Sequence, residues 1–295
     1  MNEFIALIGE YLPSVGSSIV IAVCNAFIAI CFLRKNTGTE EFEKIKCGKF
    51  GEITDILLEK RELTYSEYLR SKNFVEIAKK ADAYYDKLEN KENVNNGNYE
   101  FDWFLRFYDC ASAISNEDMQ NIWAGILAQE INKAGTFSYK TLDVLHNLQK
   151  KDAELFAKIC KYCLCSNVGW FLPENREYWE KCGIGYGEIM KLYEFGLIYK
   201  DPFIYLGVEF KDNENENIVI TRTHELSILK TSDSKETLNI YVLPLTNAGI
   251  ELYQVLNVDT NPEALSWFAM TLEQDYQVKT VIKEKIENDK QVDRS

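Results

Sequence analysis

The longest apolar run of the chain lies near its beginning. From Val15 to Leu33 the sequence is almost free of polar groups, and Arg34 and Lys35 follow directly. Roughly 20 apolar residues cross the hydrocarbon core of a bilayer, so this pattern predicts a single transmembrane helix. Basic residues follow the run and none precedes it, which predicts a cytoplasmic body. The alternative is a buried helix of a soluble domain, since the run is short for a span.

Small residues recur at three- and four-residue spacing along this run, and one amide lies among them. Such residues let helices approach closely in lipid, and an amide side chain can hydrogen-bond across a helix bundle. We therefore expect membrane lipid as a partner and a homo-oligomer. The predicted association face consists of Ser18, Ala22, Asn25, Ala26 and Ala29.

Helical periodicity dominates the sequence as far as residue 169. Thr64 and Glu67 have the spacing of a capping box and predict the start of a long helix. An Asn-rich segment, Lys91–Tyr99, predicts a loop. A helix beginning at Phe101 follows, and Ser115 with Asp118 offers the N-cap signature of the next one. Two further helices are predicted over Tyr139–Leu148 and Lys151–Cys165.

The pattern changes after Trp170. A helix over Gly187–Phe195 is predicted to end at Gly196, and Thr246 is predicted to cap a helix over Asn247–Leu256. Clusters of β-branched and aromatic residues predict strands between these helices. Another helix is expected from Pro262 to about Asn288. The predicted strands are Phe203–Phe210, Ile218–Thr223 and Leu238–Leu245, with the hairpin tip at Asp212–Asn217.

These elements predict a mainly α fold with a small α+β module that is winged-helix-like, preceded by an N-terminal single transmembrane helix. Five segments are expected. They are an anchor (1–36), a helical stalk and loop (37–98), a helical bundle (99–169), the winged-helix-like module (170–260) and a C-terminal helix and tail (261–295).

The charge of the chain argues against nucleic acid as a partner. The formal net charge is −13, and residues 170–260 carry 8 Lys or Arg against 15 Asp or Glu. Phosphate binding requires clustered basic residues, so a wing that reads DNA is disfavoured. A protein partner at the 170–260 module is the better hypothesis.

The chain offers little that would support catalysis or a cofactor. It has no phosphate-binding glycine loop, no Gly-x-Ser-x-Gly turn and no His-Glu-x-x-His helix. The only histidines, His146 and His224, are expected to be surface or satisfied polar residues. We therefore predict no enzyme activity, no catalytic residues and no cofactor.

A cluster of cysteines leaves two interpretations open. Four thiolates can bind zinc, but buried cysteines also behave as small core residues. The helical pattern around the first of them favours the core, and no metal ligand is assigned. The cysteines concerned are Cys160, Cys163, Cys165 and Cys182.

Several motifs resemble a known family. They are Asp102–Phe107 (DWFLRF), Ile114–Gln120 (ISNEDMQ) with Trp123, Leu127–Ala128, Glu130–Ile131 and Gly135–Ser138 (GTFS). The sequence resembles bacterial domain-of-unknown-function family 2806 over roughly residues 40–257. A weaker likeness is to the alpha-type abortive-infection proteins. The resemblance implies phage defence or an accessory membrane role.

One side-chain pair is predicted within these motifs. Glu130 lies beside the apolar stripe of its helix, and a buried carboxylate requires a partner. Arg106 on the preceding helix is the expected partner. We expect a structural ion pair that orients the two helices and not a catalytic one.

Together these observations predict a non-enzymatic anti-phage defence effector or sensor, resembling abortive-infection proteins. It is expected to be a single-pass protein of the bacterial inner membrane that perturbs the membrane on activation. The alternative is a membrane-tethered scaffold or protein-interaction module that recruits a partner.

Overall fold

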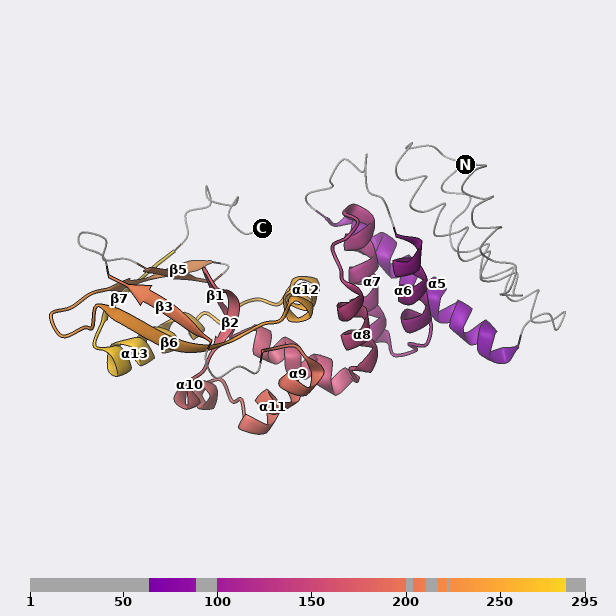
Figure 1. Cartoon of the computed structure of the whole chain (residues 1–295). Helices are drawn as coiled ribbons and strands as arrows, with labels where there is room; N and C mark the ends of the chain where they lie inside the picture. Colours follow the sequence, from indigo (N-terminus) through magenta and orange to yellow (C-terminus); the bar gives the residue numbers. More distant parts are fainter. Residues whose placement is uncertain (1–63, 89–99, 200–203, 211–216, 222, 285–295) are drawn as a thin grey trace. The chain divides into compact units, whose positions relative to one another are not determined.

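In the computed structural model of the chain, the described residues are 64–88, 100–199, 204–210, 217–221 and 223–284 (Figure 1). The chain divides into two units, the first ending at Leu142 and the second beginning at Asp143. Each unit is described by itself.

The described part of the first unit is helical. It contains α5 (Tyr65–Asp86), α6 (Phe101–Ala111), α7 (Glu117–Asn132) and the beginning of α8 (Tyr139–Asn147). The predicted capping box at the start of α5 is confirmed, because the Thr64 hydroxyl and the Glu67 carboxylate each bond the other residue's backbone N–H.

The N-cap of α7 lies one residue later than predicted. The Asn116 amide oxygen accepts a hydrogen bond from the Met119 backbone N–H at 3.1 Å. Asn116 therefore takes the capping position for which Ser115 was expected, since either side chain can serve as an N-cap and only the backbone path decides between them.

Aromatic rings make up much of the core of this unit. Helix α5 packs mainly against α7, and Trp123 of α7 is fully buried. The Phe107 ring lies edge-on to Trp123 with 5.4 Å between centroids, and Phe74 lies edge-on to Tyr108 at 5.1 Å. The predicted aromatic stripes are thus core residues, whose burial stabilises the unit.

The second unit combines helices with a β-sheet. Its helices are α9 (Lys150–Cys160), α10 (Arg176–Lys181), α11 (Tyr186–Phe195), α12 (Asn247–Leu256) and α13 (Ala264–Tyr276). Its strands are β1 (Leu164–Ser166), β2 (Gly169–Pro173), β3 (Tyr205–Glu209), β4 (Asn217–Ile220), β5 (His224–Leu229), β6 (Thr237–Pro244) and β7 (Lys279–Glu284).

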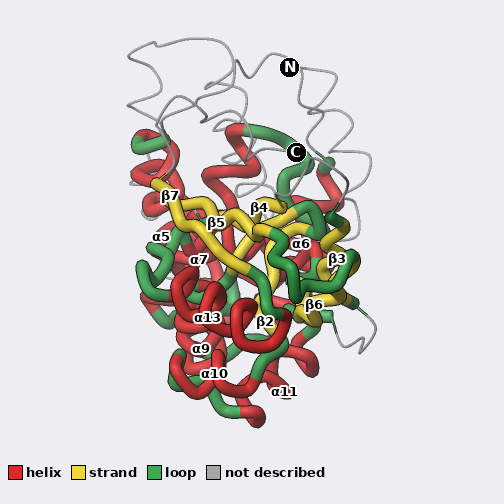
Figure 2. Tube along the Cα trace, turned by 90° about the vertical axis from the view of Figure 1, so that its left-hand side faces the viewer, coloured by secondary structure: helices red, strands yellow, loops and turns green. Residues whose placement is uncertain are grey.

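The strands form one antiparallel sheet in the order β3-β6-β2-β1-β4-β5-β7. Figure 2 shows the strands in yellow. Helix α13 packs against one face, where its Phe268 ring lies 6.1 Å from Phe171 of β2. On the other face, Tyr253 of α12 lies 4.6 Å from the neighbouring Trp170. Successive residues of a strand point to opposite faces, so β2 contributes core residues on both sides.

The start of α12 and the end of α11 meet as a local unit. Thr246 caps α12 by accepting from the Gly249 N–H at 3.1 Å, and its hydroxyl donates to the Gly196 carbonyl at 2.6 Å. Gly196 ends α11 with φ +71°, a conformation that favours glycine. A Cβ on Gly249 would overlap the Leu197 carbonyl oxygen. The predicted cap at Thr246 and the predicted helix end at Gly196 are both confirmed.

The predicted fold class is wrong. Instead of a mainly α fold with a small winged-helix-like module, the described residues form a mixed α/β fold with a seven-stranded antiparallel sheet. The strands β1, β2, β5 and β7 were not predicted. Each has six residues or fewer, which leaves little periodic signal in the sequence. β1 with β2 and β4 with β5 form local hairpins, and pairing with distant strands joins these hairpins into one sheet.

The predicted C-terminal helix also ends too late. Helix α13 stops at Tyr276, because Gln277 adopts a left-handed conformation with φ +57°. The Glu273 carboxylate then accepts from the backbone N–H and the hydroxyl of Thr280, at 2.9 and 2.6 Å. The β-branched run Thr280–Ile282 enters β7 and pairs with β5.

The predicted membrane span gains no support. In the part of the chain that the structure describes, no helix combines the length and the apolar character needed to cross a membrane. The predicted span, residues 15–33, lies outside the described residues, and the predicted association face lies there with it. The predictions of an N-terminal transmembrane helix and of a single-pass inner-membrane location are therefore not supported.

Candidate functional site

The motif residues of the first unit meet at the loop between α7 and α8. Glu130 is 5% exposed. Its carboxylate accepts from the backbone N–H groups of Gly135 at 2.6 Å and Phe137 at 3.0 Å. The indole N–H of Trp103 donates to the Phe137 carbonyl at 2.7 Å. We call Trp103, Glu130, Gly135 and Phe137 the loop-anchoring cluster.

This cluster is built to hold a backbone in place. Hydrogen bonds from N–H groups to a carboxylate are stronger than neutral ones, and Gly135 supplies the positive φ of +80° that the turn requires. Three hydrogen bonds of the cluster run between a side chain and the backbone of the loop. Its residues therefore position the chain entering α8.

The predicted pairing of Glu130 with Arg106 stays a prediction. Glu130 is buried as expected, and its two oxygens bind the loop as described above. Arg106 lies on the exposed side of α6.

The cysteines lie mainly in the core of the second unit. Cys160, Cys163 and Cys182 are buried, and Cys165 is half-buried. Burial raises the pKa of Cys163 to about 12, with neighbouring Cys182 adding to the effect. Burial likewise raises the pKa of Cys182 to about 12, against the lowering influence of Lys158. We interpret the three buried thiols as core residues because of their burial. Among the described residues no group of metal-ligating side chains is arranged to hold an ion.

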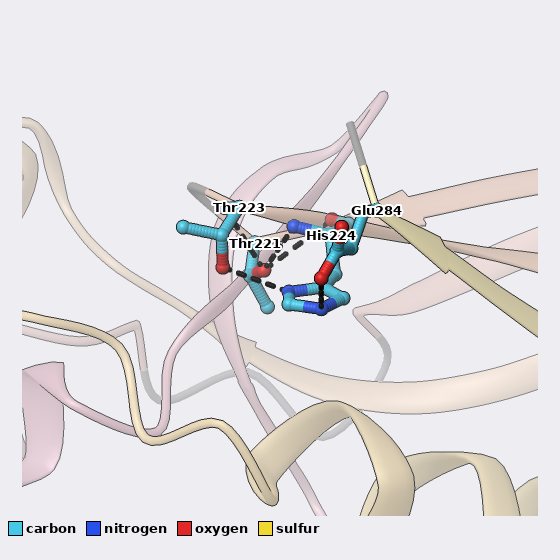
Figure 3. A network of polar contacts seen from close by, with 4 residues as sticks. All are labelled: Thr221, Thr223, His224 and Glu284. Carbon is cyan, nitrogen blue, oxygen red and sulfur yellow. Dashed lines mark hydrogen bonds and ion pairs between the residues drawn. The ribbon is translucent and has the colours of Figure 1, made fainter. Parts of the chain in front are cut away.

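His224 belongs to a network at the turn between β4 and β5 (Figure 3). The Thr221 hydroxyl accepts from the His224 backbone N–H at 3.0 Å, and the Thr223 hydroxyl lies 2.8 Å from the His224 Nδ1. The Nε2 lies 4.0 Å from a carboxylate oxygen of Glu284, which is 87% exposed. Exposed ion pairs of this kind contribute little. The network stabilises a hairpin turn, and His146 is exposed on α8.

A different arrangement lies on the outer part of the sheet, on β3 and β6. Tyr205 and Tyr241 are register partners, and their ring centroids lie 6.4 Å apart at 76°. They are 44% and 49% exposed. Glu209 lies four residues after Tyr205 in the same strand and is exposed on the same face. Two strands thus present aromatic rings and a carboxylate to solvent.

The third strand extends this surface. Pro173 of β2 pairs with Val242, and the next residue, Glu174, donates its N–H to the Tyr241 carbonyl at 3.1 Å. Glu174 therefore lies opposite Tyr241, and paired residues of neighbouring strands project to the same face. We call Tyr205, Glu209, Tyr241 and Glu174 the tyrosine–carboxylate face.

Two further tyrosines border this face. The Tyr276 hydroxyl at the end of α13 donates to the Asn239 carbonyl at 3.0 Å. Desolvation raises the pKa of Tyr276, and Asp275 and Tyr241 contribute to the shift. On α11, desolvation raises the pKa of Tyr193 to about 12, with Glu174 contributing. Partial burial also raises the pKa of Glu174 itself. Phenol and carboxylate groups therefore lie close enough at this surface to raise the pKa of Tyr276 and Tyr193.

The exposed face results from incomplete coverage by helices. On the same side of the sheet, Trp170 packs beneath α12 and Leu243 is buried. Further along β6, Tyr241 and the alternate residues Asn239 and Thr237 are exposed. This face was not predicted from the sequence. Exposed and buried positions alternate along β3 and the first half of β6, but only the register of the two strands shows that the exposed residues form one surface.

Comparison with known proteins gives one family. Residues 52–169 match the sequence model of a family described as Protein of unknown function (DUF2806). The predicted resemblance to that family is therefore confirmed over this stretch. No curated protein and no solved structure matches the chain. The match includes the loop-anchoring cluster and ends before Glu174, so the tyrosine–carboxylate face lies outside it.

Proposed function

We propose, for a chain whose residues 52–169 match the DUF2806 family, that it acts as a non-enzymatic protein-recognition module. The tyrosine–carboxylate face of the second unit is the recognition surface in this proposal. The single observation that carries it is the solvent-exposed pair of Tyr205 and Tyr241, held in register on two strands. Exposed tyrosines are enriched at protein interfaces, since one side chain supplies both apolar area and a polar group.

Recognition accounts for this surface better than catalysis does. Catalytic groups work in sites that exclude water and hold the substrate on several sides. Both tyrosine rings and the carboxylates of Glu174 and Glu209 are instead exposed on a sheet face. The negative balance of residues 170–260, with 8 Lys or Arg against 15 Asp or Glu, further favours a protein over a nucleic acid as the partner.

Site-specific photo-cross-linking in the native host tests the proposal. A photoreactive phenylalanine analogue replaces Tyr241 in one strain and Tyr65, a more exposed tyrosine of the first unit, in another. We expect one defined protein adduct at position 241, identified by mass spectrometry, which is lost when Tyr205→Leu is added. Absence of a position-specific adduct, or an adduct that is the same at position 65, contradicts the proposal.

The role in phage defence implied by the resemblance remains a proposal about the biological setting. The motifs Asp102–Phe107 and Ile114–Gln120 support it. In this setting the recognition face would sense a protein that appears during infection. Plaque counts on cells that carry the chain or Tyr241→Leu test it. We expect protection by the wild type and its loss in the variant, whereas equal plaque counts with and without the chain contradict a defence role.

A further inference from the structure

The three strands that carry the tyrosine–carboxylate face contribute charge of one sign. Strands β2, β3 and β6 contain no Lys or Arg. Carboxylates occur at Glu209 within β3 and at Glu174 directly after β2. The charges that these strands bring to the face are therefore negative, which favours a cationic ligand.

The aromatic rings favour the same ligand by a second mechanism. A cation over the face of a tyrosine ring is attracted by the negative charge density of the ring, and arginine forms such contacts most often. The Tyr205 and Tyr241 rings stand edge to face at 76°. Each ring is partly exposed, so a flat guanidinium group can stack on one ring with the second ring beside it.

The position of Glu174 completes this arrangement. It lies opposite Tyr241 across the β2–β6 register. Its carboxylate also contributes to the raised pKa of Tyr193 on α11. A row of Tyr205, Tyr241 and Glu174 therefore crosses three adjacent strands. Neighbouring strands are about 4.8 Å apart, so an arginine side chain stacked on the rings is within reach of the carboxylate.

We infer that the tyrosine–carboxylate face binds an arginine- or lysine-bearing segment of a partner protein. The rings of Tyr205 and Tyr241 receive the cationic head group, and Glu174 and Glu209 neutralise its charge. This inference rests on the proposed recognition function and specifies the chemistry of the partner. Its charge complementarity is local, because it depends on these elements and not on the net charge of −13.

Fluorescence anisotropy with defined peptides tests the inference on the full chain. The probe is a labelled peptide of alternating serine and arginine, and its matched control replaces each arginine by citrulline, which has the same shape and no charge. Measurements are made at about 0.15 M salt, where the screening length is about 8 Å. We expect the arginine peptide to bind roughly tenfold more tightly than the citrulline peptide, as a cation–π contact and an ion pair together allow.

Variants separate the face from general attraction by an acidic protein. Tyr241→Leu and Glu174→Gln should each weaken binding of the arginine peptide roughly 3- to 10-fold, whereas Tyr241→Phe keeps the ring and should change it less than about 2-fold. Glu154→Gln removes one exposed carboxylate of α9 and Tyr65→Leu removes one exposed tyrosine of α5, and both should bind as the wild type.

Two results overturn the inference. One is equal binding of the arginine and citrulline peptides, and the other is equal weakening by Glu154→Gln and Glu174→Gln. The cross-linking experiment distinguishes this failure from failure of the recognition function. A position-241 adduct whose cross-linked segment contains no Lys or Arg leaves recognition standing and removes only the cationic partner.

Discussion

In the first unit, Trp103 and Glu130 turn inward and direct their polar atoms at the backbone of one loop. In the second unit, Tyr205, Tyr241 and Glu174 turn outward on a sheet face. The family match at residues 52–169 covers the inward set and stops before the outward one. In this chain the matched stretch contains the loop-anchoring cluster, and the candidate surface for recognition lies beyond it.

The strongest way to break this comparison is to remove the inward carboxylate. Glu130→Ala leaves the Gly135 and Phe137 N–H groups without their acceptor, and hydrogen bonds to a charged group contribute roughly 1.5–3 kcal/mol each. We expect the free energy of unfolding to fall by about 3–4 kcal/mol, measured by urea denaturation. Faster hydrogen exchange at Gly135 and Phe137 should accompany the loss.

The control for this variant is Glu117→Ala on the same helix, where the carboxylate is 84% exposed. It should change the unfolding free energy by less than about 1 kcal/mol. Equal urea midpoints for the two variants would show that the Glu130 carboxylate does not hold the loop.

A smaller loss is expected from the second residue of the loop-anchoring cluster. Trp103→Phe keeps an aromatic ring in the core but removes the donor to the buried Phe137 carbonyl. An unsatisfied buried acceptor costs about 1–3 kcal/mol, so we expect a loss of about 2 kcal/mol by the same measurement. Trp103→Phe combined with Glu130→Ala should be less than additive, because both residues hold one loop. Full additivity would contradict a shared role.

The outward set should behave in the opposite way. Tyr205→Ser and Tyr241→Ser each truncate a ring that is about half exposed. Surface substitutions away from special features usually change stability by less than about 0.5 kcal/mol, although loss of a cross-strand aromatic pair adds up to about 1 kcal/mol. Thermal unfolding should therefore show little change, while Tyr205→Ser abolishes the adduct at position 241 and Tyr241→Ser weakens binding of the arginine peptide. A loss of stability as large as that of Glu130→Ala would make the face a structural element.

The smallest effect concerns alkaline pH. The folded-state pKa of Tyr193 is raised to about 12, by desolvation first and then by Glu174 and Tyr186, whereas an unfolded tyrosine ionises near pH 10. The unfolded state releases this proton earlier, so the stabilising contribution is present below pH 10 and is lost as pH rises towards 12. Tyr193→Phe should flatten the fall in stability over this range. An unchanged slope in pH-dependent urea titrations would show that Tyr193 is not shielded.

Several local features of the fold could be predicted from the sequence alone. The capping box of Thr64 and Glu67, the left-handed Gly196 and the cap at Thr246 each depend on residues within a few positions of one another. The helices α6, α7 and α8 were predicted from apolar periodicity close to their observed ranges. Cys160 and Cys163 are buried, as the helical pattern favoured, although the helix predicted over Lys151–Cys165 ends at Cys160 and the half-buried Cys165 lies in β1.

Features that depend on distant pairing were missed. The strands β1, β2, β5 and β7 are short. β1 and β2 form a local hairpin and β5 pairs with the adjacent β4, but the sheet is completed by distant pairings of β1 with β4, β2 with β6 and β5 with β7. The left-handed Gln277 ended α13 where apolar periodicity continued. The hydrogen bonds from the Gly135 and Phe137 N–H groups to Glu130 were not predicted either, because backbone N–H groups carry no sequence signal.

The sequence by itself determined where most helices begin and end and which residues avoid water, because caps and hydrophobic periodicity act between near neighbours. It also determined the family match, through motifs that hold a loop. Only the tertiary structure decided that Tyr205, Tyr241 and Glu174 form one row. These residues lie on three strands whose register is set by non-local hydrogen bonds and by the helices that cover the rest of the sheet.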